Sequence, residues 1–151
     1  MNESDRKAVE QMNAHRPAII KTLNGRVVSF DKAAGQVTMA FDISRDFCHS
    51  VDVVQGGIVT GMLDAAMSHA VFAVKDFTIR PPATYEIKVS FLAPARAGKL
   101  TAHGHVLKVG RTTAFLEADL EDENGTLLAR ATSTAMAVPR NAEQKGPAAV
   151  G

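Results

Sequence analysis

The chain has 151 residues, 46% of them hydrophobic and 22% charged, a balance that indicates one globular domain with a substantial core and excludes a disordered chain. Its net charge of +1 gives no reason to expect nucleic acid or an anionic membrane surface as a partner. The one cysteine, Cys48, excludes an internal disulfide, and the polar N-terminus lacks the apolar segment of a secretory signal. We therefore expect a cytoplasmic protein.

The first predicted elements are helical. Residues 3–23 have a helical pattern, and Pro17 should split them into two pieces because proline disrupts the interior of a helix. Residues 25–31 predict a strand. In residues 36–43 apolar side chains occupy every second position, which predicts a strand with one buried face. A loop over residues 45–54 follows.

An apolar helix is predicted from Gly56 to about Lys75. Its length is close to the minimum for a membrane span, but small and polar residues interrupt the segment: Thr60, Gly61, Asp64, Ser68 and His69. We therefore expect a helix that is buried inside protein and not in a membrane.

Four strands are predicted after this helix, over residues 84–92, 100–109, about 114–120, and 127–138. Gly104 blurs the alternation of the second of these strands and indicates a bulge there. The dipeptide Asn124-Gly125 signals a hairpin between the last two. Because short turns join these strands, we expect a mainly antiparallel sheet.

These elements predict an α+β domain in which one curved, mainly antiparallel sheet wraps a long central helix. A helix that is apolar on all sides must be covered on most of them, so a second molecule should close the structure. We expect an N-terminal helical segment over residues 1–24, the main domain over residues 25–138 and a flexible tail over residues 139–151.

The start of the apolar helix, Gln55-Gly56-Gly57, is a candidate site for an oxygen that carries or develops negative charge. The first N–H groups of a helix have no acceptor within it and lie at the positive end of the helix dipole. Glycine also lets a ligand approach the backbone closely. The alternative is that the two glycines only form a tight turn from loop to helix.

Asp64 is the single formal charge within the apolar helix. It lies on a polar stripe with Thr60 and Ser68, which are four residues away on either side. Burying a carboxylate is costly unless the group is paired or functional. A salt bridge or exposure at a surface gap would be the structural explanations, but the helix itself offers only His69 as a basic partner.

Three segments resemble hotdog-fold thioesterases of the PaaI type: VVQGGIVTGMLDAAMSHAV (53–71), TYEIKVSFLAPARAGKL (84–100) and GRTTAFLEADLEDENGTLLARATSTAMAV (110–138). The resemblance covers residues 25–138. The signature of that family is His-Gly-Gly at the start of the central helix, with Asp or Glu nine residues after the His. Here Asp64 has the expected spacing, but Gln55 replaces the His.

The resemblance implies hydrolysis of an acyl-coenzyme A thioester. It implies that the N–H group of Gly56 polarises the thioester carbonyl and that Asp64 acts as nucleophile or general base. Gln55 could donate a hydrogen bond to the same carbonyl. His49 occupies a position that often holds Asn or Gln in the family, and Thr84 falls where a Ser or Thr positions water in some members.

The resemblance also suggests groups that contact the substrate. Gly110 and Arg111 match a Gly-Arg turn that the family often carries, and Arg111 is our candidate for the phosphates of coenzyme A. Thr60 and Ser68, on the stripe of Asp64, are further candidate substrate contacts. We expect no separate cofactor, since coenzyme A is part of the substrate.

Helix geometry predicts a site shared between two chains. Gly56 and Asp64 are eight residues apart, which is roughly 12 Å along the helix axis. One thioester carbonyl cannot contact both groups of one chain, because reacting atoms must lie about 3 Å apart. If both groups act on one substrate, they come from the antiparallel helices of a two-fold dimer. We expect a homodimer, or a tetramer made of two dimers.

Two other functions fit the same features. A hotdog domain could bind acyl-coenzyme A without hydrolysis, as a sensor or carrier, and Gln55 in place of His favours this alternative. A hydratase or dehydratase would need a His–carboxylate pair, which His49 and Asp64 could supply. A metal site is not expected, because His103 and His105 share a strand face but no further ligand is suitably spaced.

Overall fold

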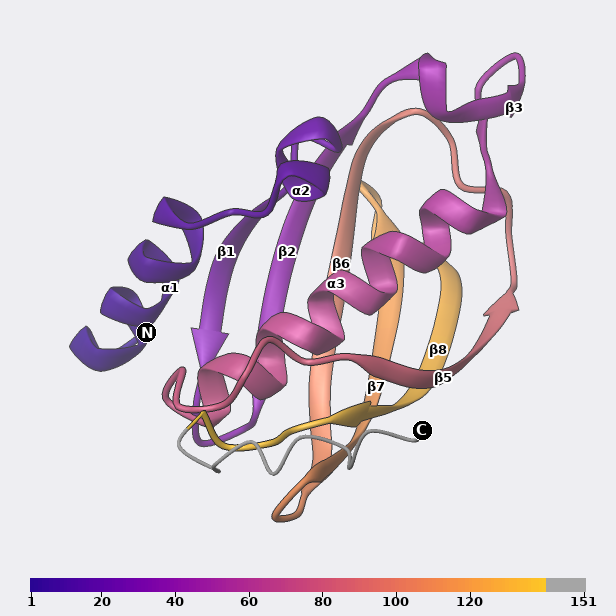
Figure 1. Cartoon of the computed structure of the whole chain (residues 1–151). Helices are drawn as coiled ribbons and strands as arrows, with labels where there is room; N and C mark the ends of the chain where they lie inside the picture. Colours follow the sequence, from indigo (N-terminus) through magenta and orange to yellow (C-terminus); the bar gives the residue numbers. More distant parts are fainter. Residues whose placement is uncertain (141–151) are drawn as a thin grey trace, which may run out of the picture.

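The computed structural model describes residues 1–140 and shows one curved sheet wrapped around one helix (Figure 1). The six antiparallel strands lie in the order β1-β2-β6-β7-β8-β5. Their bounds are β1 Arg26–Asp31, β2 Gln36–Ile43, β5 Thr84–Phe91, β6 Gly98–Val109, β7 Thr113–Asp122 and β8 Leu127–Met136. The central helix, α3, spans Gly56–Val74 and crosses the concave face of the sheet (Figure 1). The predicted α+β hotdog architecture is confirmed.

The core lies between α3 and the concave face. Side chains alternate between the two faces of a strand, so every second residue of a central strand points at the helix. The buried positions of β2 alternate as predicted, and those of β7 alternate in the same way: Val37, Met39, Phe41, Ile43, Ala114, Leu116, Ala118 and Leu120. Three side chains of α3 that are fully buried, Met62, Leu63 and Met67, complete the same core.

Gly104 of β6 marks a close approach of the helix to the sheet. A Cβ atom at this position would lie 2.3 Å from the carbonyl oxygen of Ala66 and 2.8 Å from the amide nitrogen of Met67, both in α3. Only glycine therefore lets the helix backbone lie on this strand. The predicted bulge at Gly104 is wrong, since the register between β6 and β7 shifts between Val106 and Lys108.

Two short helices cover the β1 edge of the sheet. They are α1, Glu3–Ala14, and α2, Ala18–Thr22, and the break between them confirms the effect predicted for Pro17. The amide of Asn13 donates to the Val27 carbonyl at 2.8 Å and accepts from the Val27 N–H at 3.0 Å, which fixes α1 to this strand. Three residues of the helical segment join the main core: Met12, Ile20 and Leu23.

The opposite edge of the sheet, β5, is less covered. Within the described residues β5 pairs with β8 alone, and its register shifts between Thr84 and Glu86. Apolar or aromatic side chains occupy every second position of β5, which indicates one buried face, but Tyr85 and Phe91 are 63% and 57% exposed within one chain. The alternation of β5 therefore indicates a buried face, but one chain alone leaves part of that face exposed.

The central helix is also partly open. By length and composition α3 could cross a membrane, as could the core helix of many globular proteins, and 44% of its most apolar stretch is buried inside the fold. No atom of residues 1–140 would contact a Cβ added at Gly57 or Gly61, two exposed positions one turn apart. A face of α3 therefore remains available to another molecule.

The connections mostly agree with the sequence. The expected loop contains a 3-10 helix, η1 Arg45–Phe47, and a small hairpin of β3 Cys48–Ser50 with β4 Val53–Val54. The hairpin at residues 123–126 is confirmed, with Gly125 at φ 78°. Beyond β8, Pro139 bridges to Ile79 and the Arg140 N–H donates to the Thr78 carbonyl at 2.9 Å. The rest of the expected tail, 141–151, lies outside the described residues.

Candidate active site

The first part of the candidate site is the N-terminus of α3. Gln55 is the N-cap residue, and its Oε1 accepts a hydrogen bond of 2.8 Å from the N–H group of Gly56. Gly57 has no acceptor for its N–H group within residues 1–140. This helix end thus presents one free N–H group and a second one that is held by the neighbouring side chain.

An apolar cleft of about 420 Å³ opens beside this helix end. Its wall includes Gly56 and Val59 of α3, Phe91 of β5, and His49 from the β3 strand. The ring of Phe91 lies next to Gly56, 3.4 Å from where a Cβ atom would be. The structure therefore places two of the candidate residues, His49 and Gly56, in the wall of one cleft, together with Phe91, whose position beside Gly56 depends on the course of β5.

The second part of the site is the pair formed by Asp64 and Thr84. The hydroxyl of Thr84 donates a hydrogen bond of 2.5 Å to Oδ1 of Asp64, linking the middle of α3 to the start of β5. Asp64 is half-buried. Within the described part of the chain no Lys, Arg or His side chain pairs with it. Salt bridging, one of the two structural explanations for this carboxylate, therefore finds no support in the described fold, whereas its partial exposure agrees with the other, a position at a surface gap.

The other two members of the polar stripe differ in their surroundings. The Thr60 hydroxyl donates to the carbonyl of Gly56 at 2.9 Å, so it is engaged by the backbone of its own helix. Ser68 lines a separate cavity near the second half of α3. Neither side chain meets the Asp64–Thr84 pair through a hydrogen bond among residues 1–140.

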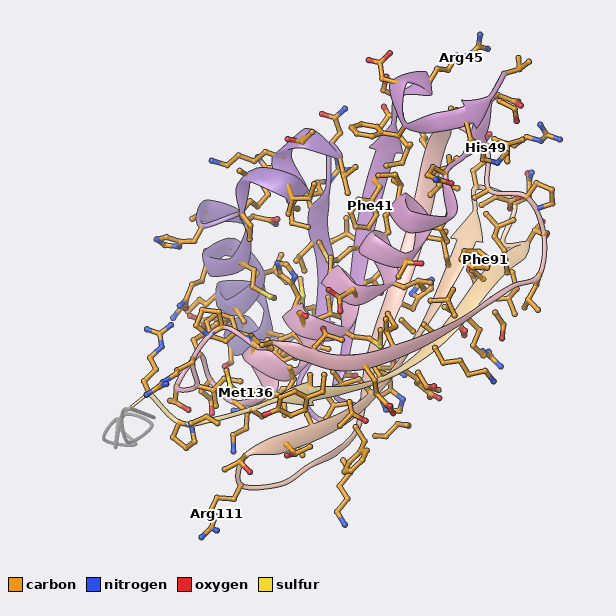
Figure 2. The ribbon with its side chains drawn as sticks, turned by 45° about the vertical axis from the view of Figure 1, so that its right-hand side comes forward. Phe41, Arg45, His49, Phe91, Arg111 and Met136 are labelled. Carbon is orange, nitrogen blue, oxygen red and sulfur yellow. The ribbon has the colours of Figure 1, made fainter. Side chains whose placement is uncertain are left out.

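Gly110 and Arg111 lie far from the first part of the site, the start of α3, in one chain. They form the exposed turn between β6 and β7, where the Gly110 N–H donates to the carbonyl of Thr113 at 2.8 Å. Figure 2 shows Arg111 at the end of the molecule opposite His49. If Arg111 contacts the same substrate as the start of α3, it must do so from another chain.

The separate cavity, of about 530 Å³, was not foreseen from the sequence. It lies between α1 and the second half of α3, and its lining includes Ser68, His69 and Phe72. Nδ1 of His69 lies 2.7 Å from the carbonyl oxygen of Ala65, and burial lowers the pKa of the imidazole below its usual value. The sequence offers one signal, a histidine in an otherwise apolar helix.

The remaining candidates do not assemble into a site. On the convex face, His103 contacts Thr38 at 3.1 Å and His105 contacts Glu117 at 3.1 Å. No group of three or more His, Cys, Asp or Glu side chains among the described residues could hold a metal ion. Cys48 is a half-buried free thiol.

Known proteins with similar sequences carry esterase and thioesterase names. A model of the thioesterase superfamily matches residues 51–129, more than half of the chain. A protein of Saccharolobus solfataricus with a provisional esterase name is 30% identical over 125 residues, covering 83% of this chain and 86% of that protein. Human acyl-coenzyme A thioesterase 13 is 23% identical over 136 residues, covering 89% of this chain and 94% of that protein. These names support a hydrolase.

Solved structures agree with the fold. A crystal structure from Ralstonia eutropha JMP134, described provisionally as a thioesterase and as a phenylacetic acid degradation-related protein, aligns with a TM-score of 0.75 at 30% identity. The alignment covers 89% of this chain and 99% of that one. The chain therefore belongs to the thioesterase superfamily and shares its hotdog fold.

Proposed function

We propose that the protein hydrolyses an acyl-coenzyme A thioester to the free acid and coenzyme A. The observation that carries the proposal is Asp64, a half-buried carboxylate on an apolar helix, hydrogen-bonded to Thr84 and not paired with any cation of the described fold. A carboxylate in this setting can act as a nucleophile or as a general base toward water. Thr84 then holds the carboxylate in one orientation.

The start of α3 supplies the electrophilic part of the site. The thioester carbonyl accepts hydrogen bonds from the N–H groups of Gly56 and Gly57, which stabilise the oxyanion that forms during attack. Since Gln55 Oε1 accepts a hydrogen bond from the Gly56 N–H group, its side chain must turn away when the carbonyl binds there. After that turn, its Nε2–H₂ group can donate to the same oxygen.

The complete site requires two chains. Within α3 the N–H group of Gly56 and the carboxylate of Asp64 are separated by eight residues, roughly 12 Å along the axis. A two-fold dimer that packs the open faces of two α3 helices antiparallel would bring one helix start beside the other chain's Asp64. The exposed Gly57 and Gly61 give that face little bulk, which suits a close approach.

One observation favours binding of acyl-coenzyme A without hydrolysis. The hydrogen bond from Gly56 to Gln55 occupies an N–H group that catalysis would use, and a protein that only binds the thioester has no need to free it. In that case Asp64 and Thr84 would only orient the ligand.

Release of free coenzyme A distinguishes the two functions. The purified protein is mixed with a panel of acyl-coenzyme A thioesters and a dye that reacts with the released thiol. We expect turnover with at least one member of the panel. Because Cys48 is itself a free thiol, the signal of the protein without substrate is subtracted and the assay is repeated with Cys48→Ser.

Asp64→Asn tests the mechanism in the same assay. The substitution keeps the shape of the side chain but removes the basic, nucleophilic carboxylate, so kcat should fall by about 10³-fold or more. The fold should persist, since removing a partly buried charge holds or raises stability. Asp42→Asn, an exposed carboxylate on β2, is the matched control and should keep wild-type activity. A folded Asp64→Asn protein with unchanged turnover would contradict the mechanism.

A further inference from the structure

The chain contains two Asn-Gly dipeptides, Asn24-Gly25 and Asn124-Gly125. In such a pair the backbone nitrogen of glycine can attack the side-chain carbonyl carbon of asparagine, because glycine has no Cβ atom to obstruct the approach. The reaction needs two conditions. The glycine N–H group must leave its hydrogen bond, and the asparagine side chain must be free to turn toward it. The two dipeptides differ in both conditions.

Asn24-Gly25, which follows α2, meets neither condition. The Gly25 N–H group donates to the carbonyl of Ile20 at 2.7 Å. The side chain of Asn24 donates to the carbonyl of Asp42 at 3.2 Å. Gly25 is also buried, and a Cβ atom there would lie 2.7 Å from the ring of Phe41. Freeing this glycine nitrogen therefore requires the end of α2 to separate from β2, which opens part of the core.

Asn124-Gly125 lies in the exposed turn between β7 and β8. The Gly125 N–H group donates to the carbonyl of Asp122 at 3.1 Å, a bond within the turn itself. Within residues 1–140 the side chain of Asn124 makes no hydrogen bond, since only its backbone N–H group is engaged. Apart from the two chain neighbours, no described residue lies within 4 Å of where a Cβ atom of Gly125 would be. Local opening of this one turn therefore frees both groups.

We propose that Asn124 is a site of spontaneous deamidation in the folded protein and that Asn24 is not. The same two-residue sequence occurs at both places, so the difference comes from the fold. At Asn124 the glycine nitrogen is held by one bond in an exposed turn, and at Asn24 it is held by a shorter bond in a buried segment. The modification is independent of the proposed hydrolase activity.

The reaction needs only water and hydroxide as a base. Hydroxide takes the proton of the Gly125 nitrogen, which forms a bond to Cγ of Asn124. The bond from Cγ to Nδ2 then breaks, and Nδ2 takes a proton from water and leaves as ammonia, which regenerates hydroxide. Water opens the resulting succinimide ring at either of its two carbonyl carbons and leaves aspartate or isoaspartate at position 124. The net reaction consumes one water molecule and releases one ammonia molecule.

Both products disturb the turn in which they form. Each adds a carboxylate close to those of Asp122 and Glu123, and like charges at short distance repel. Isoaspartate also routes the main chain through the former side chain, which lengthens the backbone of the turn. Oδ1 of Asp122 accepts hydrogen bonds of 2.9 Å from the N–H groups of Asn124 and Thr126, and this pair of bonds depends on the original backbone spacing. Deamidation should therefore lower the Tm of the protein.

Isotope-labelled water measures the reaction at both sites in one sample. The folded protein is incubated in H₂¹⁸O at physiological temperature and mildly alkaline pH, and it is then digested in ordinary water at acidic pH. Opening of the succinimide ring introduces ¹⁸O only during the incubation, so mass spectrometry of the peptides gives a rate for each asparagine. We expect the rate at Asn124 to exceed that at Asn24 by about 10-fold or more, the value of one buried hydrogen bond.

The unfolded chain is the matched control. In guanidinium chloride both glycine N–H groups lose their hydrogen bonds, so the rates at the two asparagines should become similar. Asn124→Gln is the second control, because its longer side chain keeps the amide but closes the corresponding ring much more slowly. After the same incubation this variant should contain no ¹⁸O at position 124, and its Tm should stay constant while that of the wild type falls.

The outcomes are distinct. Faster labelling at Asn124 in the folded protein, with similar rates at both sites in guanidinium chloride, supports the proposal. Equal rates at Asn24 and Asn124 in the folded protein overturn it, and so does labelling of Asn124 that occurs only in the denatured sample. A labelled wild-type protein with an unchanged Tm overturns the effect on the turn and leaves the assignment of the site standing.

Discussion

The side chain of Gln55 accepts a hydrogen bond from the Gly56 N–H group, which the proposed chemistry needs as a donor to the substrate. The bond from Gly56 N–H to Gln55 Oε1, 2.8 Å long, must break before a carbonyl can take its place. A neutral amide gives up such a bond readily, because the exposed side chain can exchange it for water. Gln55, which stands where the family has His, can therefore cap the helix until a substrate carbonyl displaces its side chain.

Two substitutions at Gln55 should have different effects. Gln55→Ala frees the N–H group but loses a donor to the carbonyl, so kcat/KM should fall about 10-fold. Gln55→Glu places a carboxylate at the positive end of the helix, where it holds the N–H group more tightly and repels the oxyanion, so the loss should exceed that of Gln55→Ala. Steady-state kinetics on both variants checks this order. A Gln55→Glu protein as active as the wild type would show that Gln55 does not occupy the oxyanion position.

Gly104 tests how closely the helix lies on the sheet. In Gly104→Ala the new methyl group would be 2.3 Å from the carbonyl oxygen of Ala66, a backbone atom that cannot move without shifting α3. We expect a loss of about 1–3 kcal/mol in the free energy of unfolding, measured by urea denaturation. Thr101→Ala, at a half-buried position of the same strand, is the control and should change stability much less. Equal stability of the wild-type and Gly104→Ala proteins would refute the close approach.

At the scale of elements, the strands and α3 could be predicted because their signals are local. The alternation of β2 and β7 and the apolar run of α3 each follow from one buried face or one buried helix. The role of Gly104 has no local signal, because its constraint comes from Ala66, 38 residues earlier in the chain, and not from its own strand. The burial of β5 cannot be predicted from its alternation, because part of its apolar face is exposed in one chain.

The candidate site was predictable in part for the same reason. Gln55, Gly56 and Asp64 belong to one continuous motif, whereas Thr84 came from a resemblance alone, and its hydrogen bond to Asp64 is shown only by the structure. The cavity at His69 joins α1, α3, the segment before β5 and Arg140, which are distant in sequence. No local pattern brings such segments together.

The hairpin between β7 and β8 depends on a charged cap. Oδ1 of Asp122 accepts hydrogen bonds from the N–H groups of Thr126 and Asn124, both 2.9 Å long. The bond from Thr126 is the largest cause that lowers the pKa of this carboxyl, and the bond from Asn124 acts in the same direction. The ionised form is therefore favoured in the folded chain.

This cap predicts a pH-dependent stability. Since the folded pKa is lower than the unfolded one, the stabilisation is present above the unfolded pKa, about 3.9, and is lost as pH falls through the lower folded value. Asp122→Ala should therefore lower Tm at pH 7, and its difference from the wild type should shrink below about pH 4. Thermal unfolding followed by circular dichroism measures both. A difference in Tm that is constant with pH would mean that the charge of Asp122 contributes nothing to the turn.

At the scale of the whole molecule, the open face of α3 and the divided site have one explanation. The N–H groups at the helix start and the Asp64–Thr84 pair lie too far apart to act on one carbonyl in one chain. The face between them is exposed at Gly57 and Gly61. A two-fold dimer would cover the face and complete two sites at once.

Mixed dimers test this arrangement directly. Asp64→Ala removes the carboxylate, and Gly56→Pro removes the first N–H group of α3. Proline suits this position, because Gly56 is the first residue of the helix and Gln55 before it has φ −58° and ψ 134°, an extended conformation that a following proline requires. Each variant alone should be nearly inactive, and circular dichroism should show that both are folded.

Unfolding and refolding the two variants together exchanges their subunits. In a mixed dimer one site combines an intact Gly56 from the Asp64→Ala chain with an intact Asp64 from the Gly56→Pro chain, and the other site has both defects. Random pairing makes half of the dimers mixed, and half of their sites are whole, so about a quarter of wild-type activity should return. Native mass spectrometry of tagged chains verifies the mixing. Each mixed dimer contains an intact Gly56 in one chain and an intact Asp64 in the other. If mixed dimers form and no activity returns, these two groups do not meet across the interface.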